Sequence, residues 1–178
     1  MYRELTDPVA IEVNIDSAIR REICFSEQIL VSQIRAAVLA AAETLNILNG
    51  CVGVFVTNDA KIRHINNNYL RHDYPTDVIS FAYFRSSLAI EGELIVSVTT
   101  AKWEARRLGC SWINEIVLYV IHGTLHLCGM NDLQPNEIVE MRKLEREALN
   151  KCGLRDFVKY LKQQASANHQ DYFDSKFA

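Results

Sequence analysis

The chain lacks any apolar run long enough to cross a membrane. Its longest uninterrupted apolar runs, 36–42 and 116–121, fall far short of the roughly 18–20 residues that a membrane-spanning helix needs. The first eight residues contain no apolar segment of the kind that a secretory signal carries. We therefore expect no membrane association, no signal peptide and a cytoplasmic location.

The sequence also lacks an excess of positive charge. Nineteen Lys and Arg residues stand against 22 Asp and Glu residues, which gives a net charge of −3. This balance argues against a protein that holds nucleic acid through bulk charge alone, although it leaves room for a local basic patch.

Paired cysteine motifs are missing as well. The five cysteines are scattered, form no CxxC pair and are odd in number. This pattern excludes a disulfide scaffold and fits reduced thiols, several of them filling the core, in a cytoplasmic protein.

The hydrophobic residues that are present predict one α+β domain. A chain of 178 residues with 49% hydrophobic residues can bury a single core. Alternation and β-branched runs predict four short strands, and periodicity with capping residues predicts about five helices. The strands are expected at 11–15, 51–57, 77–83 and 93–97, and the helices at 26–48, 58–70, 99–108, 111–127 and 134–151. We predict a small four-stranded mixed sheet packed with these helices over residues 1–161, followed by a polar, flexible tail at 162–178.

The most informative stretch lies at the end of the fourth predicted helix. His122 and His126 are four residues apart, so both imidazoles project from one helix face and can bind one metal ion. Gly129 allows the helix to end, and Asp132 follows where its carboxylate could serve as a third ligand. Three protein ligands and one open position are typical of a catalytic metal site with a bound water. The other interpretation is that the two histidines satisfy buried polar groups.

One residue that this helix lacks narrows the chemistry. A zincin protease has Glu directly after the first His as its general base, whereas this zincin-like helix has Gly123. Peptide hydrolysis is therefore disfavoured. His64, His72 and His169 show no partners in the sequence and are expected at the surface.

Three spaced motifs make the chain similar to a known family. Residues 122–129 follow the pattern H-G-x-L-H-L-x-G, residues 75–81 read P-T-D-V-I-S-F, and Gly92-Glu93-Leu94 precedes a helix that opens at Thr100-Ala101. From about Val9 to Gly153 the chain resembles the YbeY family of single-strand-specific metallo-endoribonucleases. The resemblance implies one zinc ion per chain, held at His122, His126 and Asp132. It also implies single-stranded RNA as substrate, with 16S rRNA 3′-end maturation, ribosome quality control and the small ribosomal subunit as the setting.

The chain departs from the family pattern at two positions. Asp132 stands where the family has a third histidine, and Leu70 stands where it has an arginine that is thought to handle the phosphodiester. Arg71 could substitute from the neighbouring position, and Ser80 is a second candidate to contact phosphate; both could equally be a solvated arginine and a strand serine bonded to backbone. Glu137 is a rival to Asp132 as third ligand. The departures keep open a ribosome-associated RNA-binding factor with a weakened site, and a zincin-like metallohydrolase of another substrate is a further alternative.

Five basic residues on the predicted helices are candidates for an RNA-facing patch. They are Lys61, Arg63, Lys102, Arg106 and Arg107. Charges on helices are more often simply solvated, so the sequence leaves both interpretations open.

Overall fold

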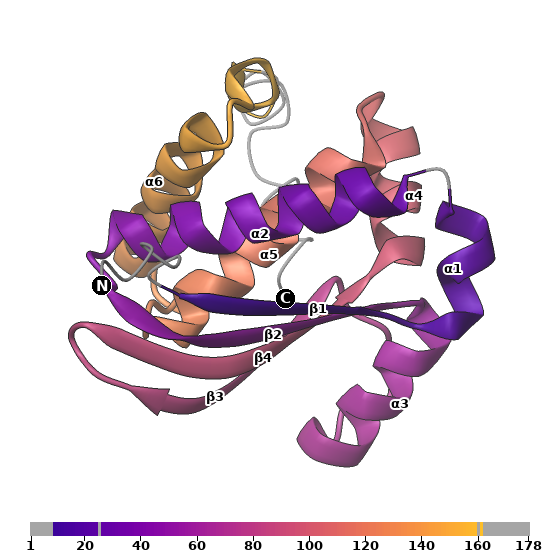
Figure 1. Cartoon of the computed structure of the whole chain (residues 1–178), viewed down its shortest axis with the longest axis horizontal. Coiled ribbons are helices and arrows are strands. Elements are labelled where there is room, and N and C mark those ends of the chain that lie inside the picture. The colour runs from indigo at the N-terminus through magenta and orange to yellow at the C-terminus, as the bar shows by residue number, and fades with distance from the viewer. Residues whose placement is uncertain (1–8, 25, 160, 162–178) are drawn as a thin grey trace, which may run out of the picture.

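A four-stranded mixed sheet forms the base of the molecule. The computed structural model describes residues 9–24, 26–159 and 161 (Figure 1). Its strands are β1 (Ala10–Ile15), β2 (Asn49–Thr57), β3 (Val78–Arg85) and β4 (Ala89–Ser97). They lie in the order β1-β2-β4-β3, with β1, β2 and β4 parallel and β3 antiparallel at one edge. The predicted mixed sheet of four strands is confirmed.

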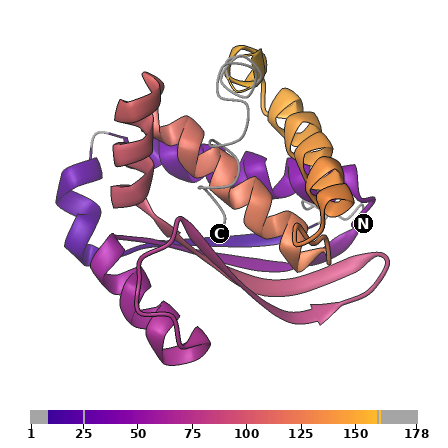
Figure 2. The ribbon, with the colours of Figure 1, turned by 180° about the vertical axis from the view of Figure 1, so that it is seen from behind.

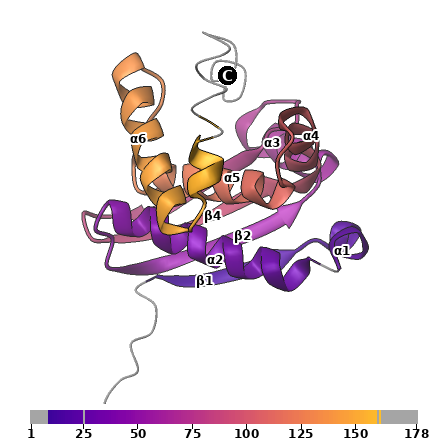
Figure 3. The same ribbon diagram turned by 90° about the horizontal axis from the view of Figure 1, so that it is seen from above.

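Helices cover the two faces of this sheet unequally. The helices are α1 (Ser17–Ile23), α2 (Glu27–Thr44), α3 (Asp59–Leu70), α4 (Val98–Leu108), α5 (Trp112–Leu127) and α6 (Pro135–Lys151). Residues 155–159 form a further helical segment. Helices α2, α5 and α6 pack on one another over one face (Figure 3). Figure 2 shows from behind that α3 lies on the opposite side of the sheet. Most of the core therefore lies between the sheet and the layer that contains α5.

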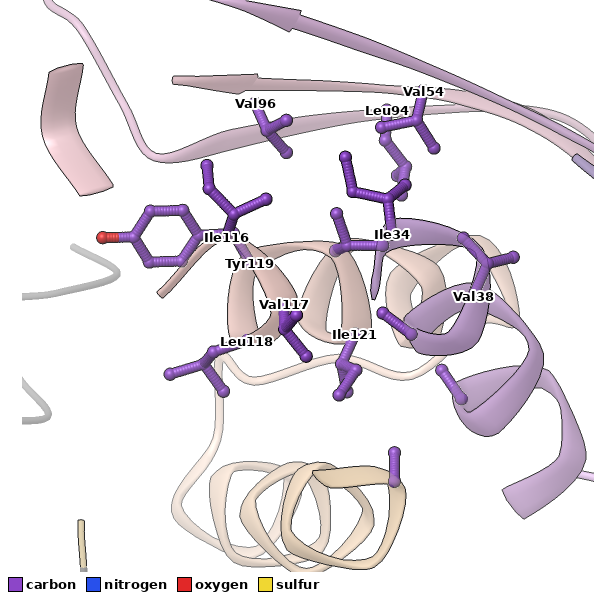
Figure 4. Close-up of a cluster of buried hydrophobic side chains, with 14 of the residues drawn as sticks. Ile34, Val38, Val54, Leu94, Val96, Ile116, Val117, Leu118, Tyr119 and Ile121 are labelled. Carbon is purple, nitrogen blue, oxygen red and sulfur yellow. The ribbon is translucent and has the colours of Figure 1, made fainter. Parts of the chain in front are cut away.

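Helix α5 is the centre of that core. Twelve of its 16 residues are buried, as expected for a helix that is apolar on nearly every side. Figure 4 shows Val54, Leu94 and Val96 reaching from the sheet towards Ile116 of α5 and Ile34 of α2. Any side chain on the last turn of α5 is therefore held by the best-packed part of the molecule.

The opposite face of the sheet has a smaller core of its own. Ile62 of α3 is fully buried against Ile79 and Ile95 of the sheet, with Phe55 and Phe81 packed beside them. Helix α3 is thus attached through a few apolar contacts. Its last residue, Leu70, leads directly into the loop 71–77 that precedes β3.

The N-terminal half differs from the prediction in two places. The sequence did not predict helix α1. It has only seven residues, and the one feature that marks its start is Asp16, whose side chain accepts a hydrogen bond from the N–H of Ala18. Helix α2 ends at Thr44 instead of residue 48, because Asn46 adopts a left-handed conformation with φ of 56°. The N–H groups of Leu48 and Asn49 then bond to the carbonyl oxygen of Leu88, which starts β2 earlier than expected.

Strand β4 also begins earlier than predicted, at Ala89 instead of residue 93. Its first residues pair with β3 on one side and with β2 on the other, for example Ile90 with Arg85 and with Gly50. The sequence pattern placed the start of this strand after Glu91-Gly92, and glycine disfavours strand interiors. Pairing on both sides outweighs that preference, and the strand continues through it.

Within the described residues, no single helix combines the length and hydropathy that a membrane span requires. Helices α1 and α2 would meet the requirement only together, and they are bent by 110° at their junction. The predicted tail at 162–178 lies outside the described residues.

Candidate metal centre

The two histidines predicted as ligands lie side by side on the last turns of α5. Their Nε2 atoms are 3.0 Å apart, and their rings meet edge to face with centroids 4.5 Å apart. His122 is almost fully buried, with 3% of its surface exposed. The side chain of His126 is 29% exposed and reaches towards solvent.

The turn after α5 brings Asp132 back to the histidines. Gly129 has a φ of 96°, a conformation that L side chains rarely adopt, and this residue reverses the chain. The Oδ2 atom of Asp132 then lies 3.6 Å from Nε2 of His122, and Oδ1 lies 3.7 Å from Nε2 of His126. One ligand atom from each of the three residues lies within 4.8 Å of the others.

The hydrogen bond at Nδ1 of each histidine determines which ring nitrogen can bind a metal ion. Nδ1 of His122 lies 2.8 Å from Oε1 of Glu145, and Nδ1 of His126 lies 2.9 Å from the carbonyl oxygen of Met130. Both partners are acceptors, so each Nδ1 donates to its partner, and Nε2 is the ring nitrogen turned towards Asp132 and the other histidine. Two Nε2 atoms and a carboxylate oxygen then converge on one point, which fits a divalent cation of the zinc type.

A buried ion pair on α6 supports His122 from behind. Both carboxylate oxygens of Glu145 lie 2.7 Å from Nη1 of Arg142. Burial by itself would raise the pKa of Glu145, but the hydrogen bond with His122 and the charge of Arg142 outweigh it and hold that pKa below its ordinary value. Glu145 therefore remains a carboxylate. No sequence pattern distinguishes it from the other acidic residues of α6.

The protonation of His126 also favours metal binding. Its pKa lies below the ordinary histidine value, first because burial disfavours the charged ring and then because His122 lies beside it. A neutral imidazole is the form that coordinates a metal ion.

The three residues lie at one side of a cavity of about 370 Å³. Besides His122, His126 and Asp132, it is lined by residues of α3, of the loop 71–77 and of β3. These are Asn66, Leu70, His72, Tyr74, Thr76, Asp77, Val78, Ile79 and Ser80. The cavity therefore joins the zincin-like helix to the P-T-D-V-I-S-F motif, which lies far from it in the sequence.

Ser80 lies in the cavity, as its candidate role requires. Its hydroxyl donates a hydrogen bond of 3.2 Å to the carbonyl oxygen of Gly123, one residue after His122. To contact a phosphate oxygen, which accepts hydrogen bonds, the Ser80 hydroxyl would have to donate to the phosphate instead of to Gly123. A role in contacting phosphate remains a prediction.

Gly123 lies on the side of α5 that packs against the sheet. A Cβ atom at this position would lie 2.9 Å from Cδ2 of Leu94, and 3.0 Å from both Oγ of Ser80 and Cγ2 of Val78. Side chains of β3 and β4 thus fill the space that the general-base glutamate of a zincin protease would occupy. The absence of that glutamate has a steric cause in this fold.

Arg71 lies outside the cavity lining, whereas Leu70 and His72 on either side of it belong to the lining. Arg71 ends α3 in a left-handed conformation with φ of 64°, and its N–H donates to the carbonyl oxygen of Asn67 at 3.2 Å. Its part in contacting phosphate stays a prediction. His72, expected at the surface without a partner, is exposed but stacks on Tyr74 at the cavity.

Glu137, the rival third ligand, has a different partner. Its Oε2 atom accepts hydrogen bonds from the N–H groups of Gln134 at 2.9 Å and Leu133 at 3.2 Å, as in a capping box at the start of α6. The structure brings Asp132, not Glu137, into the cluster with the histidines.

Most of the candidate basic patch is engaged in ion pairs. Arg63 pairs with Asp73, Lys102 with Glu22, and Arg107 with Glu104. Lys61 lines a separate cavity between α3 and the sheet, and Arg106 lines a hollow beside α4. These five residues are not part of the metal cavity lining.

Comparison with known sequences identifies the family. The sequence pattern described as Endoribonuclease YbeY matches residues 15–153. The chain belongs to the YbeY family. The resemblance inferred from the three motifs and the predicted fold class are both confirmed.

Individual YbeY relatives and a solved structure agree with this assignment. The chain is 41% identical to the Endoribonuclease YbeY of Rhodopirellula baltica over 69% of this chain and 64% of that relative, a little under two thirds of its length. It is 38% identical to that of Bacteroides thetaiotaomicron over 56% of this chain and 72% of the relative. The solution structure of TM1509 from Thermotoga maritima shares the fold, with a TM-score of 0.50, 19% identity and coverage of 91% of this chain and 98% of that one.

Proposed function

We propose that this chain is a metal-dependent endoribonuclease that cleaves unpaired RNA with one zinc ion, held by His122, His126 and Asp132. The observation that carries the proposal is the convergence of two histidine Nε2 atoms and one carboxylate at a cavity wall. Membership of the YbeY family supports RNA as the substrate. An ion bound here would polarise a phosphate oxygen and lower the pKa of a bound water to about 7.

The chain's own residues prepare the site in three ways. Glu145 orients His122, and the carbonyl oxygen of Met130 orients His126, so both rings are fixed before a ligand arrives. Asp77 accepts hydrogen bonds from the N–H of Val78 and the hydroxyl of Thr76, which shapes the loop that faces the metal-binding residues. Ser80 inside the cavity and Arg71 beside it are the proposed contacts to the RNA backbone.

The proposed setting follows from the family. We place the chain in the cytoplasm, with 16S rRNA of the small ribosomal subunit as substrate and with roles in 3′-end maturation and ribosome quality control. Support comes from YbeY family membership. The domain proposed to do this comprises residues 1–161, with 162–178 as an appended tail.

The direct test is cleavage of a labelled RNA oligonucleotide by the zinc-loaded protein. We expect cleavage of the single strand, little cleavage of the same sequence in a duplex, and loss of activity in EDTA with recovery on adding zinc. Metal analysis should give one ion per chain, and His122→Ala should abolish both metal and activity. Cleavage that persists in EDTA, or a purified protein without transition metal, would contradict the proposal.

A second function is favoured by one observation. Leu70 lines the cavity where an arginine of the YbeY family is expected, so the cavity has lost a strong phosphate ligand. An RNA-binding factor with a weakened site would bind the single strand without cleaving it in the same assay. A metallohydrolase acting on peptides is disfavoured by the close packing at Gly123, and casein should remain intact.

A further inference from the structure

The metal cavity has few side chains that can carry positive charge, although it is the proposed binding site of RNA, a polyanion. Its lining includes two carboxylates, Asp77 and Asp132, but neither lysine nor arginine. A phosphodiester needs positive charge or strong donors around its oxygens. Apart from the proposed ligands His122 and His126, His72 is the one described lining residue whose side chain can carry positive charge.

Three polar side chains of the lining, those of Ser80, Thr76 and Asn66, already donate hydrogen bonds to the protein. The hydroxyl of Ser80 donates to Gly123, and that of Thr76 donates to Asp77. The side-chain amide of Asn66 donates to the carbonyl oxygen of Tyr74 at 2.9 Å. His72 differs from them, since its described side-chain contact is a ring stack, which leaves both ring nitrogens at the edge of the imidazole able to hydrogen-bond a ligand.

The backbone around His72 is fixed, although its side chain is exposed. Arg71 reverses the chain with its positive φ, and the N–H of His72 then donates to the carbonyl oxygen of Asn66 at 3.3 Å. Asn66 is buried, so one residue of α3 anchors the loop both at His72 and, through its amide, at Tyr74. Arg63 anchors the residue between them through a two-point ion pair with Asp73, at 2.8 and 2.9 Å.

The side chain of His72 is also constrained. Its ring lies on that of Tyr74, with centroids 5.3 Å apart and planes inclined by 13°. A stacked ring has fewer orientations to lose when it binds a ligand, which lowers the entropic cost of the contact.

We propose that His72 contacts a phosphate of the bound RNA, from the loop 71–77 that lines the cavity together with the proposed metal ligands. This inference rests on the proposed function, and it assigns to His72 the contact inside the cavity that Leu70 cannot make. The sequence-based expectation assigned the phosphate contact to Arg71, whose side chain is not part of the cavity lining. The imidazole would donate a hydrogen bond to a non-bridging phosphate oxygen and add positive charge when protonated.

The test compares His72→Gln, His72→Arg and a matched control, His64→Gln, in the zinc-loaded protein. His64 is another exposed histidine, on α3, whose ring bonds to Asn68 outside the metal cavity. Cleavage of a labelled single-stranded RNA by the zinc-loaded protein gives kcat and KM. Fluorescence anisotropy of the metal-free protein in EDTA, where the RNA stays intact, gives RNA affinity at several salt concentrations. Metal content is measured for every variant.

We expect His72→Gln to lower kcat/KM by roughly 10²-fold, the usual loss for one donor to a developing charge. Metal content should be unchanged. His72→Arg should recover most of the loss, and His64→Gln should match the unmodified protein. The slope of log affinity against log salt should be steeper for His72→Arg than for His72→Gln by about 0.7, the value for one phosphate contact on a single strand.

Two results would overturn this inference while leaving the proposed function intact. One is a wild-type kcat/KM for His72→Gln together with equal salt slopes for the Gln and Arg variants. The other is loss of metal in His72→Gln, which would assign the residue to the metal-binding residues. If the unmodified, zinc-loaded protein neither binds nor cleaves the RNA, the proposed function fails, and the phosphate contact of His72 fails with it.

Discussion

Replacing Glu145 by glutamine tests whether the buried residue behind His122 controls metal affinity. In Glu145→Gln the new side chain would keep the size of the original and an oxygen that can accept the Nδ1–H of His122. The substitution would remove the negative charge that now lies 2.8 Å from that nitrogen. The amide group would also face Nη1 of Arg142, which at present donates to both carboxylate oxygens at 2.7 Å.

The expected magnitude follows from the role of such partners at metal sites. Loss of a carboxylate partner of a ligating histidine typically costs 10–100-fold in metal affinity, which corresponds to about 1.4–2.7 kcal/mol. At a free zinc concentration 100 times the dissociation constant of the unmodified protein, bound metal stabilises the fold by about 2.7 kcal/mol. With a 100-fold weaker site, the same zinc concentration gives only about 0.4 kcal/mol.

The assay is competition for zinc with a chelator of known affinity, combined with urea unfolding with and without metal. Glu147→Gln is the matched control, because Glu147 lies on the same helix but is exposed. The control should keep the affinity and the metal-induced stabilisation of the unmodified protein. A Glu145→Gln protein that binds zinc within about twofold of the unmodified one would refute the argument. The unfolding curve in EDTA separates weaker metal binding from a weaker fold.

Three further predictions use other residues of the site and its surroundings. Asp132→Ala should lower zinc affinity by at least about 100-fold, more than the loss of a residue that only hydrogen-bonds a ligand. Asp132→His and Glu137→Ala should both retain zinc in equilibrium dialysis. Loss of zinc in Glu137→Ala alone would show that the ligand is Glu137. Gly123→Ala should cost about 1–3 kcal/mol in the free energy of unfolding, because its Cβ would press on Leu94, Ser80 and Val78; an unfolding curve equal to that of the unmodified protein would contradict the close packing. Burial raises the pKa of the Cys128 thiol to about 11, which leaves about 0.1% thiolate at pH 8. Iodoacetamide should therefore modify the exposed Cys51 long before Cys128, as mass spectrometry of peptides would show. Modification in the reverse order would refute this prediction.

The parts of the site that could be predicted from the sequence are those that depend on a single helix and the turn that follows it. His122 and His126 share a helix, and the geometry of a helix fixes which residues four apart meet. Asp132 follows within the same short turn, which Gly129 makes sharp. In each case local geometry was enough.

The parts that could not be predicted depend on contacts between distant elements. Glu145 is 23 residues from His122 and lies on another helix, where several acidic residues look alike in the sequence. His72 has no periodic pattern around it, and its place at the cavity depends on the left-handed turn at Arg71 and on the anchor at Asn66. For the fold, likewise, α1 and the early start of β4 depend on a single cap and on pairing across the sheet.

The two sides of the metal cavity differ in local stability. His122 lies on α5, whose residues are mostly buried, so its backbone opens only when much of the core unfolds. Residues 71–75 opposite are all exposed and are anchored by a few hydrogen bonds and one ion pair. Under the proposed function, substitutions in that loop would alter which RNA sequences fit without weakening the proposed metal ligands, whereas almost any change to α5 would affect metal binding and folding together. If the proposed function holds, substrate preference could thus diverge through the loop while the chemistry proposed for α5 stays the same.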